Sequence, residues 1–190
     1  YFVVAHFHLV MGVSAIFGAQ EFDKGDLISQ QSSDISYPIT ISEAIDINNK
    51  NFITLVDRVM SKISTSSKLN GIKQVEADAT YSTWRDSDDY FIDWSRSAEE
   101  IRRLIDAVGS PYMGARSLTA DGKLIRITKA EAINDVSCEL RHVRKVIFIN
   151  NGIPDIICGS GLLRILEAHI IDNDQETNYL PMKSFRVKFT

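Results

Sequence analysis

The sequence predicts a mixed α/β fold in two parts, with an α/β part first and a small β-barrel last. A helical apolar period over residues 48–64 indicates the first part. From Ser117 onward, short apolar runs alternate with DG, NNG and GSG turns, which is typical of a small barrel. The chain has 190 residues, 44% of them hydrophobic, which is enough for one ordinary domain or two small ones.

The α/β part is predicted from three strands and one helix. The strands are expected at residues 1–10, 12–18 and 27–31, because these runs are β-branched or aromatic and end at glycine or polar turns. In the helix over 48–64, the large apolar residues fall on one stripe and are expected in the core: Phe52, Leu55, Val56, Val59, Met60 and Ile63.

A polar stretch at 64–71 predicts the end of this part. A second helix is expected over 97–109, where Ser97 and Glu100 form a capping box and Gly109 follows the last turn. Its buried stripe is expected to be Ile101, Leu104, Ile105 and Val108. Barrel strands are predicted at 123–133, 145–151, 154–158 and 162–171. We therefore divide the chain into residues 1–70, a linker over 71–95 and a C-terminal part over 96–190.

Composition and charge indicate which kinds of binding partner the chain is expected to have. The net charge of −4 and pI near 5.6 do not indicate a protein that is basic overall. No apolar run approaches the ~20 residues of a membrane helix, and the N-terminal segment lacks the basic start of a signal peptide. We expect a cytoplasmic protein without membrane contact. His6 and His8 share one face of the first strand, but no third ligand is suitably spaced, so no metal is expected.

Two short stretches could carry chemistry. Asp23 lies in EFDKGD, an Asp-x-Gly pattern that taken alone is a common turn. Tyr81, Trp84 and Arg85 combine aromatic planes with a guanidinium, a set that can stack a base or a sugar ring and hold a phosphate. Trp84 could equally anchor the linker on the first domain.

A resemblance to a known family joins these stretches. ATYSTWRDSDDYFIDW (79–94) and the following SRSAEEIRRLIDAVGSPYMGA resemble the C-terminal half of the folate-dependent formyltransferases. That family includes methionyl-tRNA formyltransferases and sugar N-formyltransferases. Upstream, GVSAIFGAQEFDKGDLISQ is similar to the family stretch that runs from G-V-S/T through D-x-G-D-I. The resemblance implies part of a Rossmann-like formyltransferase domain, followed by a small OB-like β-barrel, with formyl-tetrahydrofolate as co-substrate.

The resemblance also implies a site. It places Asp23 at the catalytic aspartate and His6, or alternatively His8, at the catalytic histidine. The histidine would act as general base with the aspartate as its partner. Val4 stands where the family has an asparagine, or His6 does if His8 is the catalytic histidine, and His6 and Asp23 are only 17 positions apart. The residues implied to contact folate are Leu9, Met11, Gln20, Glu21 and Phe22, and those implied to contact the acceptor are Tyr81, Trp84 and Arg85.

The acceptor is predicted from charge. Residues 81–190 hold 15 Lys and Arg against 16 Asp and Glu, a balance that favours a nucleotide-linked amino sugar over tRNA. Such sugars enter lipopolysaccharide O-antigens. The alternatives are a methionyl-tRNA formyltransferase, in which the short cationic run ELRHVRK (139–145) could contact phosphate, and a truncated, non-catalytic paralogue that serves as a binding or dimerisation module. Homodimer formation is left open.

Overall fold

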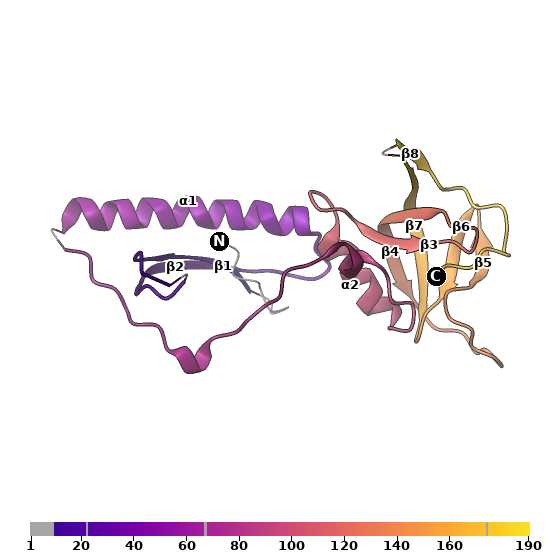
Figure 1. The fold of residues 1–190 in the computed structure, drawn as a ribbon, viewed down its shortest axis with the longest axis horizontal. Coiled ribbons are helices and arrows are strands. Elements are labelled where there is room, and N and C mark those ends of the chain that lie inside the picture. The colour runs from indigo at the N-terminus through magenta and orange to yellow at the C-terminus, as the bar shows by residue number, and fades with distance from the viewer. Residues whose placement is uncertain (1–9, 22, 67, 174) are drawn as a thin grey trace. The chain divides into compact units, whose positions relative to one another are not determined.

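The computed structural model describes residues 10–190 apart from 22, 67 and 174, and only the backbone of residues 10 and 11. The chain forms two compact units, Tyr1–Trp84 and Arg85–Thr190 (Figure 1). The boundary between the units falls inside the segment predicted as a linker. No helix in the described part of the chain is long and apolar enough to cross a membrane.

The first unit contains a two-stranded sheet and one long helix. Strands β1 (Val10–Ile16) and β2 (Leu27–Asp34) pair antiparallel, and helix α1 (Ile41–Thr65) lies alongside them (Figure 1). A 3₁₀ turn, η1 (Glu76–Asp78), follows. The described residues of this unit contain no parallel strands, so the Rossmann-like part of the predicted fold is not seen there. The strand predicted at 1–10 lies outside the described residues except for its last residue.

Helix α1 starts earlier than predicted, and its apolar stripe is mostly exposed. It begins after Thr40, whose hydroxyl accepts a hydrogen bond from the Glu43 amide while the Glu43 carboxylate accepts one from the Thr40 amide. Leu55 is buried, whereas the side chains of Phe52 and Met60 are 58% and 55% exposed. The prediction of a buried stripe was therefore wrong within this unit, because a two-stranded sheet is too narrow to cover it.

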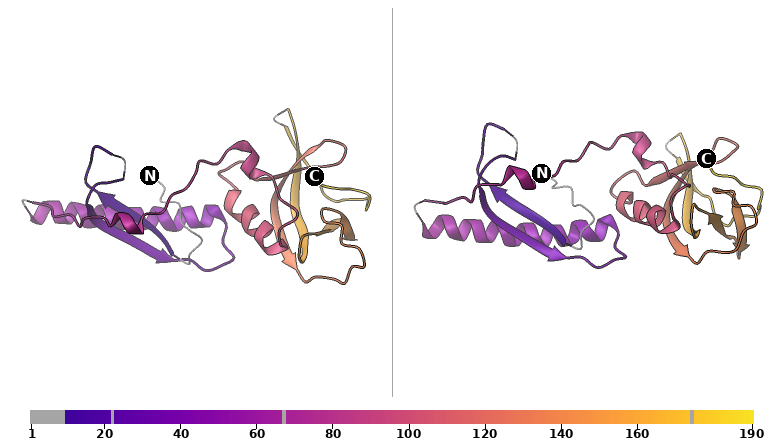
Figure 2. Two further views of the ribbon diagram at one scale, coloured as in Figure 1. Left: turned by 60° about the horizontal axis from the view of Figure 1, so that its bottom comes forward. Right: turned by 90° about the horizontal axis from the view of Figure 1, so that it is seen from below.

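The second unit is a sheet with one helix packed against it (Figure 2). Its elements are η2 (Ser87–Tyr90), α2 (Ala98–Val108), β3 (Ala115–Leu118), β4 (Leu124–Ile133), β5 (Val146–Asn150), β6 (Ile153–Ile157), β7 (Leu162–Asp172) and β8 (Gln175–Asn178). The strands are antiparallel in the order β3-β4-β7-β6-β5, and β8 pairs with β7.

The predicted barrel is not closed, because β3 and β5 do not pair with each other. The last residues of the chain lie between these two edges instead. Phe189 forms an isolated bridge with Thr119, just after β3, and Lys188 forms one with Lys145, just before β5. Single bridges of this kind depend on contacts between residues distant in sequence, which no local pattern reveals.

The core of the second unit confirms the predicted α2. Ile101, Ile105 and Val108 are each no more than 1% exposed, and the Ser97–Glu100 capping box is present. The Trp94 ring lies 5.3 Å from that of Phe189, and its indole N–H donates to the Ser117 hydroxyl at 3.0 Å. Trp94, from the IDW stretch, is therefore a packing residue that ties the start of the unit to its C-terminus.

Candidate functional site

The turn that joins β1 to β2 carries Asp23. It is closed by a hydrogen bond from the Phe17 amide to the Asp26 carbonyl at 3.0 Å, and Asp23 adopts a left-handed backbone with φ of 59°. A Cβ atom on Gly25 would lie 1.7 Å from the Phe17 carbonyl oxygen, so only glycine fits there. The turn thus holds Asp23 on an exposed tip.

The segment after α1 is hydrogen-bonded to this turn. Ile72 and Leu27 exchange two backbone hydrogen bonds of 2.8 Å. The side-chain amide of Gln74 donates hydrogen bonds to the backbone carbonyl of Asp23 at 2.6 Å and to that of Gly25 at 2.7 Å. These bonds fix the backbone of the turn and leave the Asp23 carboxylate without a hydrogen-bond partner among the described residues.

An ion pair also connects the turn to the segment after α1. The Lys24 ammonium lies 2.9 Å from the Glu76 carboxylate, which also accepts a hydrogen bond from the Tyr81 hydroxyl at 3.1 Å. The hydrogen bond from Lys24, followed by that from Tyr81, lowers the pKa of Glu76 below its usual range. Tyr81 is therefore tethered through Glu76 to the same turn that carries Asp23.

The three residues implied to contact the acceptor have different surroundings. The ring of Tyr81 is 83% exposed although its hydroxyl is held, and Trp84 is 95% exposed. Trp84 therefore does not anchor the linker by packing within the first unit. Arg85 begins the second unit, and its guanidinium carbon lies 5.7 Å from the centre of the Tyr90 ring.

The structure describes some of the residues implied to contact folate. Gln20 and Glu21 are exposed on the Asp23 turn, with the Glu21 carboxylate 3.8 Å from the Lys24 ammonium. The backbone of Met11 pairs with Ser33 in the β1–β2 ladder. The remaining expectations, on His6, His8, Leu9 and Phe22, lie outside the described residues. In the part of the chain that the structure describes, no group of three His, Cys, Asp or Glu side chains could hold a metal ion.

Sequence reasoning missed a group of cations in the second unit. Lys183, Arg186 and Lys188 line a hollow of about 470 Å³, together with Lys123. Lys123 pairs with Asp121 at 2.9 Å, whereas the other three have no ion pair among the described residues. A signal was present, since LPMKSFRVKF places a cation at every second or third position.

Two further cations lie beside this hollow. The Phe189 amide donates to the Arg144 carbonyl at 3.0 Å, and Lys145 bridges Lys188, so these segments run side by side. Residues opposite each other across such a bridge point to the same face of the sheet. We call Arg144, Lys145, Lys183, Arg186 and Lys188 the cationic strip. The balanced charge of residues 81–190 therefore does not mean an even distribution, because these five cations have no ion pair among the described residues and lie in neighbouring segments.

Comparison with known proteins identifies the family. Residues 85–184, just over half of the chain, match the family model described as "Formyl transferase, C-terminal domain". The chain belongs to the formyl transferase family. The matched range covers nearly all of the second unit, including the cationic strip up to Lys183.

Curated relatives of this formyl transferase chain are methionyl-tRNA formyltransferases. That of Clostridium novyi is 31% identical over 146 residues, which cover 76% of this chain and 45% of the relative. That of Marinobacter nauticus is 29% identical over 163 residues, covering 84% and 50%. That of Paraburkholderia phymatum is 29% identical over 145 residues, covering 76% and 43%. The chain spans about half the length of these relatives.

Solved structures share the fold at lower identity. HypX from Aquifex aeolicus in complex with tetrahydrofolic acid has a TM-score of 0.64 at 14% identity, covering 91% of this chain and 29% of HypX. An N-formyltransferase from Helicobacter canadensis, in complex with folinic acid and dTDP-3-aminofucose, has a TM-score of 0.55 at 15% identity, covering 83% and 55%. These likenesses support the fold of this formyl transferase chain.

Proposed function

We propose that this chain takes part in transferring a formyl group from formyl-tetrahydrofolate to the amino group of methionyl-tRNA. The cationic strip favours this acceptor, because Lys183, Arg186 and Lys188 line one hollow and Lys145 lies opposite Lys188. Neighbouring Lys and Arg side chains without ion pairs are what a tRNA backbone requires. The names of the sequence relatives support the same choice. A tRNA acceptor would place the reaction in the cytoplasm.

The proposed chemistry needs few groups. His6 takes a proton from the attacking amine, and Asp23 orients that imidazole and stabilises its charged form. A bond forms between the amine nitrogen and the formyl carbon, the bond from that carbon to the folate nitrogen breaks, and the folate nitrogen takes up the proton. The exposed, backbone-fixed tip of the β1–β2 turn suits Asp23 to this role.

The oxyanion of the tetrahedral intermediate needs donors as well. Val4 stands where the family has an asparagine, so one amide donor is missing. The loss of one such donor lowers the rate by roughly 10²–10³. We therefore expect slow turnover, with the His6 imidazolium as the remaining donor.

We further propose ligand contacts for the other residues of the site. Met11, Gln20 and Glu21 would contact folate together with Leu9 and Phe22. Tyr81 and Trp84 would stack on a base of the acceptor, since both rings are almost fully exposed, and the Arg85 guanidinium would hold a phosphate.

A nucleotide-linked amino sugar is the second candidate acceptor. The even total of charges in the second unit favours it, because a small nucleotide needs only one or two cations. The Helicobacter canadensis enzyme of similar fold is named as a complex with such a sugar, dTDP-3-aminofucose. With this acceptor, the exposed Trp84 would stack on the base and Arg85 would contact the pyrophosphate.

Salt-dependent binding of tRNA distinguishes the two acceptors. The triple variant Lys183→Gln/Arg186→Gln/Lys188→Gln removes three unpaired cations, so the slope of log affinity against log salt should fall by about 2–3. The matched control is Lys123→Gln, because that cation is already paired with Asp121. Equal slopes for the triple variant and the wild type, measured by filter binding with initiator tRNA, would contradict a tRNA contact at the strip.

A further inference from the structure

A second site lies on the sheet of the second unit, where four polar residues form one row. The strand register places Arg116 of β3 opposite Arg126 of β4, Arg126 opposite His169 of β7, and His169 opposite Asn178 of β8. Residues opposite each other in adjacent antiparallel strands point to the same face, with Cβ atoms about 5 Å apart. We call these four residues the polar row.

The polar row contains buried nitrogens that lack partners. Only four side-chain nitrogen or oxygen atoms in the described part of the chain are buried without a hydrogen bond, and three of them lie in this row. They are Nε of Arg116, Nε of Arg126 and Nδ1 of His169. Buried polar groups normally find partners, so the concentration of these nitrogens in one row makes the row a candidate ligand site.

The position of Arg126 is fixed by its neighbours. A Cβ atom on Gly114 would lie 2.7 Å from the Cδ atom of Arg126, so the arginine stem crosses over this glycine. The other end of the side chain pairs with Glu176. Arg116, in contrast, has no ion pair among the described residues, so no carboxylate there competes with a ligand for its guanidinium.

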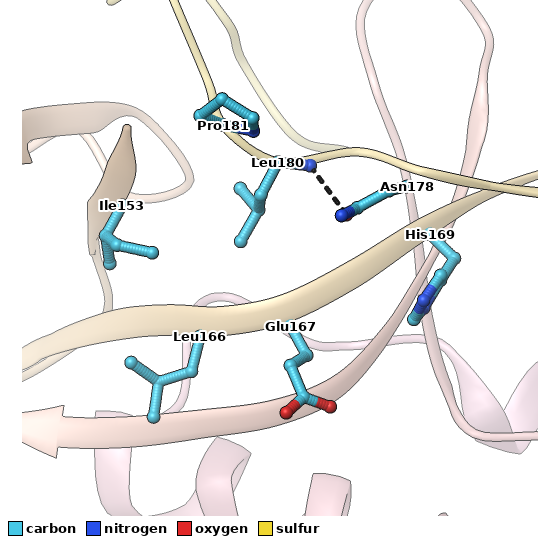
Figure 3. Close-up of a pocket in the computed structure, with 7 residues that line it drawn as sticks. All are labelled: Ile153, Leu166, Glu167, His169, Asn178, Leu180 and Pro181. Carbon is cyan, nitrogen blue, oxygen red and sulfur yellow. Dashed lines mark hydrogen bonds between the residues drawn. The ribbon is translucent and has the colours of Figure 1, made fainter. Parts of the chain in front are cut away.

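His169 and Asn178, at one end of the row, line a hollow of about 490 Å³ together with Glu167 (Figure 3), and Arg126 follows His169 along the row, outside the lining. One wall is apolar, with Ile153, Leu166, Leu180 and Pro181. The Asn178 side chain is held by the Leu180 amide, which donates to its Oδ1 atom at 3.1 Å. A hollow of this size, apolar on one side and polar on the other, suits a small molecule.

We propose that the polar row and this hollow bind a phosphate monoester with a flat apolar body, of the nucleoside monophosphate class. Arg116 is suited to the phosphate, because it has no ion pair among the described residues and a guanidinium binds phosphate oxygens through parallel N–H donors. Arg126 is already paired with Glu176 and adds only its unpartnered Nε–H. The apolar wall takes the ring. The nearby carboxylates have cations of their own, since Glu176 pairs with Arg126 and Glu167 lies 4.0 Å from the Lys129 ammonium. This proposal does not depend on the proposed function.

The test is calorimetric titration of the chain with adenosine 5′-monophosphate, adenosine and inorganic phosphate. We expect saturable binding of the monophosphate at one site, with adenosine and phosphate each at least about tenfold weaker, because each lacks one half of the contacts. Arg116→Gln should weaken the monophosphate about tenfold without lowering the thermal midpoint, since it breaks no ion pair. His169→Gln, a second variant on another strand, should also weaken it.

Lys183→Gln is the matched control, because it removes the same charge from the cationic strip instead of the polar row. Monophosphate binding that Lys183→Gln weakens as much as Arg116→Gln would place the ligand at the strip and overturn the proposal. A lack of saturable binding in the millimolar range would overturn it too, and would indicate that water molecules bind the unsatisfied nitrogens. Tight binding of inorganic phosphate alone would refute the part played by the apolar wall.

Discussion

At the scale of single residues, Asp155 shows how a buried charge depends on its partner. Its side chain is 2% exposed, and the Arg164 guanidinium donates to both carboxylate oxygens at 2.8 and 3.0 Å. Arg164→Met leaves the carboxylate buried and unpaired, so we expect the free energy of unfolding to fall by about 3 kcal/mol in urea titrations. Arg103→Met, on the exposed face of α2, should cost under about 1 kcal/mol. Equal losses would contradict this account.

The two cysteines should differ in reactivity. Burial raises the pKa of the Cys158 thiol to about 12, whereas Cys138 is partly exposed. At pH 8 only about one Cys158 thiol in ten thousand is ionised, and the thiolate is the form that reacts. Treatment of the native chain with iodoacetamide should therefore label Cys138 first, as peptide mass analysis would show. Equal labelling rates would mean that Cys158 is accessible.

At the scale of elements, Asp135 pins the loop between β4 and β5. Its carboxylate accepts hydrogen bonds from the Gly161 amide at 3.1 Å, from Arg141 at 2.9 Å and from the Val136 amide at 2.8 Å. These contacts, that of Gly161 first, lower the pKa of Asp135 below its ordinary value near 3.8. The carboxylate is therefore more acidic in the folded than in the unfolded chain.

A lowered folded pKa gives stability that is present above the unfolded value and is lost as the pH falls through the folded value. Asp135→Asn should thus destabilise the chain at pH 7, with a smaller difference from the wild type near pH 3. Urea titrations of both proteins at the two pH values measure this. A difference that stays constant down to pH 3 would mean that the carboxylate's charge does not stabilise the loop.

The elements also show what local patterns can reveal. Helix α2 was predicted at both ends, because its capping box, apolar stripe and terminal glycine agree. The start of α1 after Thr40 was missed, because the polar run NNKN (48–51) interrupts the apolar residues of the helix before the stripe that begins at Phe52. The short strands β3 and β8 have no clear pattern, since four residues give too few alternations, and their pairing with longer strands defines them.

At the scale of the whole molecule, the total charge and the distribution of charge favour different acceptors. Residues 81–190 are balanced in sum, yet Glu99 and Asp106 of α2 pair with arginines of the same helix, while the cationic strip has no ion pair among the described residues. Such a strip depends on the bridge between Lys145 and Lys188, which are far apart in the sequence. The turn that carries Asp23, by contrast, could be predicted from the sequence because its Asp-x-Gly pattern is local, and the role of Asp23 stays a prediction.

The most direct test of the central claim is mass analysis of methionyl-tRNA after incubation of the chain with formyl-tetrahydrofolate. We predict a gain of one formyl group on the methionine, reduced at least about 10²-fold by Asp23→Asn because the proposed base loses its partner. The Clostridium novyi relative serves as positive control. A gain on nucleotide-linked amino sugars but not on methionyl-tRNA would contradict the proposed acceptor, and no gain on either would contradict catalysis by this chain.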